Sequence, residues 1–378
     1  MLLQSEHMEP EEDSSAEELQ LKESKEVVPL NTWVLISNLK LAYNLTRNSD
    51  GSFNRNLDEF LDRKVPVSSV EREDDPVTFM DVTIDRTSGI WSRIFIPRAS
   101  HNNNASSTTH GTPIFFYFHG GSFVHMSANS AVYHTVCQQL ARLCQAVVIS
   151  VNYRRAPEHK YPAAYNDCYA ALTWLKVQVL RGVAHAWLPR TADLGRCFLV
   201  GDSNGGNIVH HVGVRAAESG AELGPLRVAG HILIIPMFGG NRRTQSELRF
   251  DGQYFVTIKD RDFYWQSFLP AGADRDHPAC NIFGPSSRSL EGVVLPPSLV
   301  AVAGLDMIKD WQLQYVEGMR NAGKDVELLF LEEATVGFFI FPNTGHFHRL
   351  MDKITAFIDR DGDQHLTRRT GITRRTTT

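Results

Sequence analysis

A serine framed by glycines stands at 201–205, in the sequence Gly-Asp-Ser-Asn-Gly, which is the spacing of a nucleophile held in a sharp turn. The apolar run 197–200 precedes it and a run of helical character, 208–217, follows it. Ser203 is therefore expected between a strand and a helix, where glycines permit a strained turn and the helix N-terminus stabilises an anion. The pentapeptide is common by chance, so the prediction of a nucleophile elbow rests on the flanking strand and helix.

A second glycine-rich loop lies about 80 residues before this serine. The segment 114–118 is wholly apolar, as expected for a buried parallel strand, and it leads directly into His119-Gly120-Gly121. Backbone N–H groups exposed by such glycines bind developing negative charge in lipases and esterases. The sequence predicts that these three residues form an oxyanion hole.

A serine hydrolase needs an acid and then a histidine after the serine in the chain. Asp306 directly follows the predicted strand 298–304 and is the expected acid; the alternative is an aspartate that caps the helix starting near Asp310. The loop after the last predicted strand contains Val336 and no histidine. Without an imidazole the serine has no proton acceptor, a loss that typically costs on the order of 10⁴- to 10⁶-fold in rate.

Two later histidines keep an enzymatic alternative open. His346 and His348 fall on the predicted closing helix, where surface or capping histidines are the simpler interpretation. If one of them were recruited as the base, Ser203 and Asp306 would serve an active carboxylesterase. Hydrolysis of a p-nitrophenyl ester that disappears in Ser203→Ala would favour this alternative.

Strands and helices alternate along most of the chain, which predicts an α/β fold with a mostly parallel, doubly wound sheet opened by an antiparallel pair. The expected divisions are an acidic, disordered tail, an N-terminal helical lid, an α/β-hydrolase core and a second disordered tail, at 1–26, 27–66, 67–358 and 359–378. A cap-like insertion within the core is expected at about 239–292.

The predicted lid helix is apolar on more than one side. Trp33, Ile36, Leu39 and Tyr43 recur at helical spacing, and further apolar residues stand between them. A surface helix needs a single apolar stripe, so a second stripe indicates a helix that packs on its own domain and also on something else. The alternative is a helix buried entirely within the fold.

Composition narrows the class of protein. The 378 residues carry a net charge of −5, which argues against a nucleic-acid partner, and no run is long and apolar enough to span a membrane. The five cysteines lack Cys-x-x-Cys spacing and suggest reduced core thiols of a cytosolic or nuclear protein. Alternating aspartates at 359–363 lack the context of an ion loop, so neither a metal nor a cofactor is expected.

Three motifs together resemble the hormone-sensitive-lipase-like carboxylesterases: His-Gly-Gly, Gly-Asp-Ser-x-Gly-Gly-Asn, and Tyr-Arg-x-Ala-Pro-Glu at 153–158. Within that family, the segments 28–38, 254–262 and 334–338 resemble the plant gibberellin receptors. The resemblance covers about 27–358 and leaves out both tails. In those receptors a valine replaces the catalytic histidine, and Val336 stands at that position.

The resemblance implies a receptor of the nucleus and cytoplasm that binds a bioactive gibberellin, a diterpenoid acid, in a former esterase pocket. Its N-terminal lid would close over the hormone and recruit a DELLA repressor, which an F-box ubiquitin ligase would then mark for degradation. The hormone carboxylate would be held by Gly121, Ser122 and Ser203, with Gly120 assisting. The ring hydroxyl of the hormone would accept a hydrogen bond from Tyr133.

The remaining implied contacts fall into three groups. Polar contacts, through water or directly, would come from Asp260 and Arg261. The apolar body of the hormone would lie against Val256, Tyr264, Val336, Gly337 and Phe339. The lid would contribute Ile36 and Leu39 on its inner side, while the repressor would meet Leu30 and Trp33.

Three residues depart from the usual pattern of seed-plant receptors, which have an aromatic residue at Leu39, tyrosine at Phe339 and serine at Asn204. The missing tyrosine hydroxyl is worth about 0.5–1.5 kcal/mol if it makes a hydrogen bond, and the smaller Leu39 trims lid packing. These changes point to a lineage outside the flowering plants and to altered affinity or selectivity.

Overall fold

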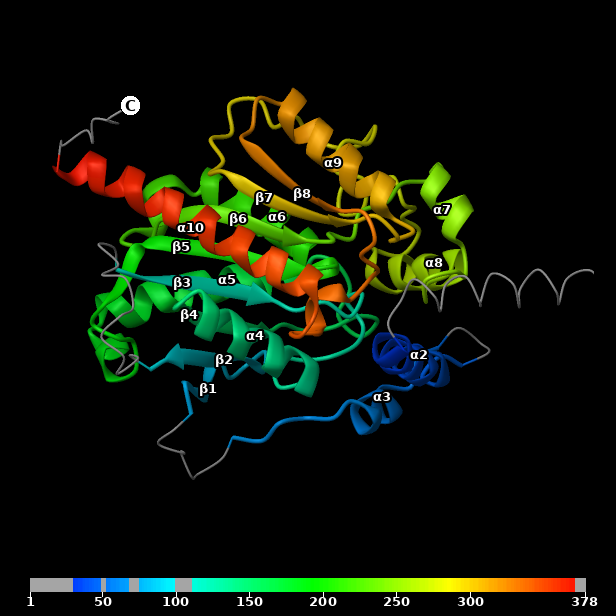
Figure 1. The fold of residues 1–378 in the computed structure, drawn as a ribbon, viewed down its shortest axis with the longest axis horizontal. Helices are drawn as coiled ribbons and strands as arrows, with labels where there is room; N and C mark the ends of the chain where they lie inside the picture. The colour runs from blue at the N-terminus through cyan, green and yellow to red at the C-terminus, as the bar shows by residue number, and fades with distance from the viewer. Residues whose placement is uncertain (1–29, 49–51, 68–74, 99–110, 371–378) are drawn as a thin grey trace, which may run out of the picture.

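An eight-stranded sheet forms the centre of the computed structural model, which describes residues 30–48, 52–67, 75–98 and 111–370 (Figure 1). The strand order is β1-β2-β4-β3-β5-β6-β7-β8. Strands β3 to β8 pair in parallel, while β1 with β2 and β2 with β4 pair antiparallel, so the predicted sheet is confirmed. The strands are β1 Val77–Asp85, β2 Ile90–Pro97, β3 Thr112–Phe118, β4 Val147–Asn152, β5 Ala192–Asp202, β6 Val228–Ile234, β7 Ser298–Ala303 and β8 Val326–Leu331.

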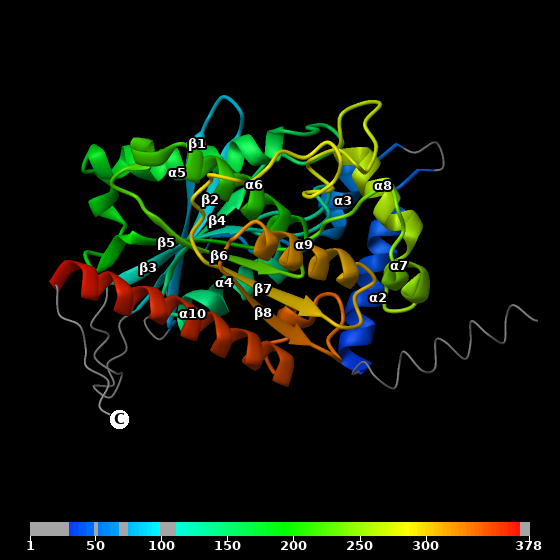
Figure 2. The ribbon, with the colours of Figure 1, turned by 90° about the horizontal axis from the view of Figure 1, so that it is seen from above.

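Helices cover both faces of the sheet, as Figures 1 and 2 show. Two of them, α4 (Ala131–Leu143) and α10 (Gly345–Thr370), lie on one face. The other face carries α5 (Ala163–Leu180), α6 (Asn204–Glu218) and α9 (Lys309–Asn321). Short 3₁₀ turns occur at Val183–Ala186, Gly220–Leu223 and Phe338–Ile340.

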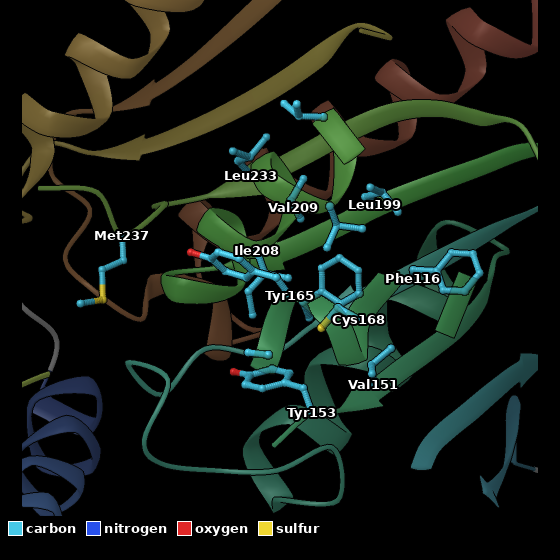
Figure 3. Packing of buried hydrophobic residues seen from close by; sticks show 14 of the residues in the cluster. Phe116, Val151, Tyr153, Tyr165, Cys168, Leu199, Ile208, Val209, Leu233 and Met237 are labelled. Atoms are coloured by element: carbon cyan, nitrogen blue, oxygen red, sulfur yellow. The ribbon is translucent and has the colours of Figure 1, made fainter. Parts of the chain in front are cut away.

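The core on the α5 and α6 side shows why the central strands are uniformly apolar. Phe116 of β3 and Leu199 of β5 pack against Val209 of α6 and Cys168 of α5 (Figure 3). Residues on the other face of the same strands meet α4 and α10, so both faces of β3 are excluded from water. All five cysteines are buried and unpaired, as the sequence predicts.

Four helices lie at the carboxyl-terminal edge of the parallel strands. The lid consists of α2 (Leu30–Leu45) and α3 (Arg55–Leu61), and the insertion contributes α7 (Gln245–Phe250) and α8 (Ile258–Phe268). Figures 1 and 2 place α2 beside α8 at this edge. The helix predicted in this N-terminal segment is confirmed, and it has apolar residues on two sides, because Ile36 is buried while Leu30 is exposed.

Two element ends differ from the sequence-based expectation. The closing helix α10 runs to Thr370, beyond the expected end at Ile358, so the start of the tail predicted to be disordered is helical. No proline interrupts this stretch, and Arg360 pairs with Glu327 of β8. Strand β6 stops at Ile234, whereas the apolar run 230–237 predicts a strand that continues to Met237, because Ile235 has a positive φ of 41°.

Several predicted features lie outside the described part of the chain. These are the acidic tail at 1–26, the last residues at 371–378 and the side chains of the aspartates at 361 and 363. Within the described residues, no helix has the length and apolarity required to cross a bilayer.

Candidate ligand-binding site

Ser203 sits in a strained turn between β5 and α6, with φ 52° and ψ −120°. Glycines are required on either side of it because there is no room for a Cβ atom. A Cβ on Gly205 would lie 1.8 Å from the carbonyl oxygen of Phe118, and one on Gly201 would lie 2.4 Å from that of Gly205. The predicted elbow geometry is therefore present.

The amide that faces an anion at this elbow is not that of the serine. The Ser203 N–H donates to the carbonyl oxygen of Ile234 at 2.9 Å. Helix α6 begins at Asn204, and the first amides of a helix have no acceptor within it. An anion beside Ser203 would thus be met by the amides that open α6.

The loop after β3 contributes fewer donors than predicted. The Gly120 N–H donates to Asp202 Oδ1 at 3.0 Å, so it is not available to a ligand. His119 is buried away from the cavity: its Nδ1 donates to the Gly120 carbonyl oxygen at 2.8 Å, and its ring stacks on Tyr153. Burial lowers the pKa of His119 to about 3. Of the three residues predicted as an oxyanion hole, only Gly121 lines the cavity.

Asp202 organises this region and was not predicted as a site residue. It accepts from the hydroxyls of Tyr117 at 2.7 Å and Tyr133 at 2.9 Å, as well as from Gly120. Burial raises the pKa of Asp202 to about 6, even though these hydrogen bonds act in the opposite direction. Because the Tyr133 proton is directed at Asp202, Tyr133 offers the cavity an acceptor rather than the expected donor.

A single cavity, with an empty volume of about 890 Å³ including its mouth, lies over Ser203 and under α2. Apart from Gly120, every residue that the resemblance assigned to ligand binding lines it: Ile36, Leu39, Gly121, Ser122, Tyr133, Ser203, Val256, Asp260, Arg261, Tyr264, Val336, Gly337 and Phe339. The sequence analysis missed other lining residues, namely Lys40, Tyr43, Asn44, Arg47, Met126, Val132, Asp202, Ile235, Phe255 and Ile340. Tyr43 and Arg47 continue the helical spacing from Ile36, which was the available signal.

The cavity contains no histidine. Val336 and Ser203 both line it, and within the described residues no hydrogen bond joins Ser203 to an imidazole. His346 packs its ring near Phe338 at 6.3 Å and His348 is exposed on α10, and neither lines the cavity. Neither histidine of the enzymatic alternative is therefore placed to act on Ser203.

A chain of buried polar contacts joins the lid to the core. Arg47 donates to the hydroxyl oxygen of Tyr264 at 2.6 Å and to Asp260 at 2.7 Å. The Tyr264 hydroxyl lies 3.0 Å from Nε2 of His125, whose Nδ1 lies 2.6 Å from Asp58 Oδ1 in α3. The imidazole also stacks on Tyr43 at 3.8 Å. Since burial lowers the pKa of His125 to about 4, the neutral ring donates from Nδ1 and accepts at Nε2.

The second lid helix is attached by several ionic contacts. Arg55 donates to the carbonyl oxygen of Ala156 at 2.6 Å and to Glu158 at 2.9 Å, and its other terminal nitrogen pairs with Asp58. Asp58 also lies 3.6 Å from Arg155. By contrast, the inner side of α2 meets the core through apolar residues such as Ile36, and Arg47, two residues beyond the end of α2, adds an ion pair with Asp260.

Comparisons with known proteins agree with this geometry. A family model described as the alpha/beta hydrolase fold matches residues 115–340. The chain is 53% identical over 355 residues to gibberellin receptor GID1C of Arabidopsis thaliana, covering 92% of this chain and 99% of that receptor. It is 46% identical to gibberellin receptor GID1 of rice, covering 92% and 98%.

Esterases are also similar. Carboxylesterase 20 of Arabidopsis thaliana is 35% identical and covers 66% of this chain and 74% of its own length. The solved esterase of Pyrobaculum calidifontis aligns with a TM-score of 0.61 at 27% identity, over 75% of this chain and 84% of its own. With its elbow, its histidine-free cavity and its lid, the chain belongs to the gibberellin receptor (GID1) family within the α/β-hydrolase fold.

Proposed function

We propose that this protein is a receptor that binds a bioactive gibberellin in the cavity under α2 and does not hydrolyse it. The observation that carries the proposal is that Ser203 and Val336 both line the cavity, while no histidine is among its described lining residues. The elbow keeps the groups that bind an anion, while the wall offers no imidazole to deprotonate the serine. The close relatives named as gibberellin receptors support the same function.

The hormone carboxylate would be held by Gly121, Ser122, Ser203 and the amides opening α6. The apolar diterpenoid body would lie between the lid and the core, against Ile36, Leu39, Val256 and Val336, which line the same cavity. Tyr133 would accept a hydrogen bond from the ring hydroxyl. Tight burial of apolar surface with a few placed polar groups is the usual design of a small-molecule site.

We further propose that the outer side of the closed lid binds a DELLA repressor. Among the described residues, large apolar side chains of α2 and α3 are exposed: Leu30 is 73% exposed and Phe60 84% exposed, and Val34, Leu41 and Leu45 of α2 are exposed as well. Trp33, which was expected to face the repressor, tilts its ring against Phe255 at 4.7 Å and is only half-buried. The repressor would connect the receptor to an F-box ubiquitin ligase in the nucleus and cytoplasm.

Calorimetric titration tests the proposal directly. A bioactive gibberellin should bind the purified chain, and its methyl ester should bind more weakly. Ser203→Ala should weaken the binding of the acid by roughly tenfold to a hundredfold, since one hydrogen bond to a charged group is lost. In the same preparation, p-nitrophenyl acetate should be hydrolysed no faster by the wild type than by Ser203→Ala. Serine-dependent turnover or an absence of gibberellin binding would refute the proposal.

Repressor recruitment needs its own test. Binding of a DELLA repressor should strengthen in the presence of hormone, because the hormone favours the closed lid that carries the exposed apolar side chains. Equal affinity with and without hormone would contradict the coupling. A fluorescent fusion would show whether the protein resides in both nucleus and cytoplasm.

A further inference from the structure

Asp306 holds the place of the acid in the hydrolase order but has different neighbours. It follows β7, is 2% exposed, and accepts from Gln312 Nε2 at 2.9 Å and from the Ile308 N–H at 3.1 Å. Its charged neighbour is Arg261, whose Nη2 lies 4.0 Å from Asp306 Oδ1. The carboxylate thus faces a guanidinium instead of orienting an imidazole.

Arg261 is a cation whose charge is only loosely neutralised. Its side chain lines the cavity, the residue is 4% exposed, and Nε is buried without a hydrogen-bond partner. A buried guanidinium is costly unless its donors are satisfied, and the contact with Asp306 is too long for a hydrogen bond. Arg47, the other arginine on this wall, is tightly bound to Asp260 and Tyr264. Arg47 Nε is also buried without a partner, but among the described arginines that line the cavity only Arg261 has no carboxylate within hydrogen-bonding distance.

We propose that Asp306, retained at the triad position, now sets the charge selectivity of the cavity through Arg261. As the counter-ion of this guanidinium it offsets part of the positive potential that an acidic ligand meets. Its negative charge lowers the free-energy cost of burying Arg261 in the unliganded protein. The same charge limits the preference of the cavity for an acid over a neutral analogue. The inference rests on the proposed function, since it concerns selection of a carboxylate ligand in the same cavity.

The neighbourhood of Asp306 makes a conservative test possible. Gln312 Oε1 is buried without a partner, while its Nε2 bonds to Asp306. In Asp306→Asn the new side-chain N–H₂ group can be satisfied by that oxygen, and the carbonyl oxygen can still accept from the Ile308 N–H. The substitution removes one negative charge while keeping size and hydrogen-bonding capacity, so the fold should be retained.

The first measurement needs no ligand. Unfolding midpoints are compared for the wild type, Asp306→Asn, Arg261→Gln and the double variant. If the charges of the two side chains compensate each other, the double variant should have an unfolding midpoint about 3 °C or more above the midpoint expected from the sum of the two single-variant shifts. Additive midpoints would overturn the inference, whether or not the protein binds a gibberellin.

The second measurement is the ratio of dissociation constants for gibberellic acid methyl ester and gibberellic acid. Asp306→Asn should raise this ratio on the order of fivefold, because a negative charge near the ligand carboxylate is removed, whereas Arg261→Gln should lower it. A purely structural role for Asp306 would shift both dissociation constants together and leave the ratio unchanged. An unchanged or lowered ratio in Asp306→Asn would overturn the inference.

A matched control is available elsewhere in the chain. Asp167 lies on α5, is 1% exposed and is not among the residues that line the cavity; it accepts three hydrogen bonds from Arg154, two of them from the guanidinium. Asp167→Asn makes the same chemical change and should destabilise the protein while leaving the ester-to-acid ratio unaltered. If the wild type binds neither compound, the proposed function fails, and the midpoint cycle alone then decides whether Asp306 and Arg261 are coupled.

Discussion

His125 lies 2.6 Å from Asp58, through its Nδ1, and this contact fastens the lid helix α3 to the loop that follows the oxyanion glycines. The same imidazole reaches Tyr264 of α8 and stacks on Tyr43 of α2. One fully buried ring therefore contacts both lid helices and the insertion. A substitution at this single position should therefore disturb the packing of α2, α3 and α8 together.

Acid should weaken this junction. The pKa of His125 is lowered by burial from about 6.5 to about 4, so between these values the unfolded chain binds a proton that the folded protein does not. Stability should therefore fall as the pH decreases from about 6.5 to 4, and this residue contributes on the order of 3 kcal/mol to the loss. Guanidinium unfolding at pH 7 and at pH 5 measures how far the free energy of unfolding falls over this part of the range.

The contribution of His125 can be isolated from that of other buried histidines by substitution. His125→Gln should be less stable than the wild type at pH 7, and the difference should shrink at pH 5. His185→Gln, at an exposed position, is the control and should follow the wild type at both values. A wild-type-like pH dependence in His125→Gln would exclude this assignment.

The Arg47–Asp260 contact should keep α2 in place. Its two side chains are 17% and 12% exposed and their atoms are 2.7 Å apart. Arg47→Gln should cost about 2 kcal/mol, because Asp260 loses a buried partner, and it should speed cleavage of α2 by chymotrypsin. Arg242→Gln, an exposed arginine of the insertion, should change neither quantity. Equal cleavage rates for the two variants would show that the apolar contacts alone hold α2.

Hormone affinity should respond to the size of the side chain at Leu39. This leucine lines the cavity from α2. Leu39→Phe should tighten gibberellin binding by about fivefold, since the larger ring buries more apolar surface under the lid. Leu41→Phe changes the same helix on its exposed outer side, where Leu41 is 59% exposed, and should leave the affinity unchanged. Calorimetry on the three proteins decides, and weaker binding by Leu39→Phe would mean that the cavity has no room for the ring.

The elbow should not tolerate a methyl group at Gly205. A Cβ there would lie 1.8 Å from the Phe118 carbonyl oxygen, which belongs to the adjacent strand and cannot move aside. Gly205→Ala should destabilise the protein by more than about 3 kcal/mol or prevent its folding. Gly345→Ala, where nothing lies within 4 Å of the added carbon, should be close to the wild type in thermal unfolding.

Local patterns in the sequence were sufficient for the architecture. The apolar runs that became β3 and β5 predicted buried parallel strands, and glycines around Ser203 predicted the strained turn, because both depend on neighbouring residues. The absence of a histidine from the loop that directly follows β8 is likewise visible in the sequence itself. Helix ends were less predictable: α10 extends past Ile358, where a contact of Arg360 with Glu327 on another element supports it.

Only the tertiary structure decided which polar groups are free to meet a ligand. Gly120 is 82 residues from Asp202 in the chain, yet its amide is committed to that carboxylate. Arg261 lies opposite Asp306 because α8 of the insertion packs over the end of β7. Sequence spacing determines which face of a helix or strand a residue occupies, but a hydrogen bond between distant elements depends on how they pack. The chain alone therefore identified the cavity and most of its wall, and the packing of its elements assigned the donors and charges within it.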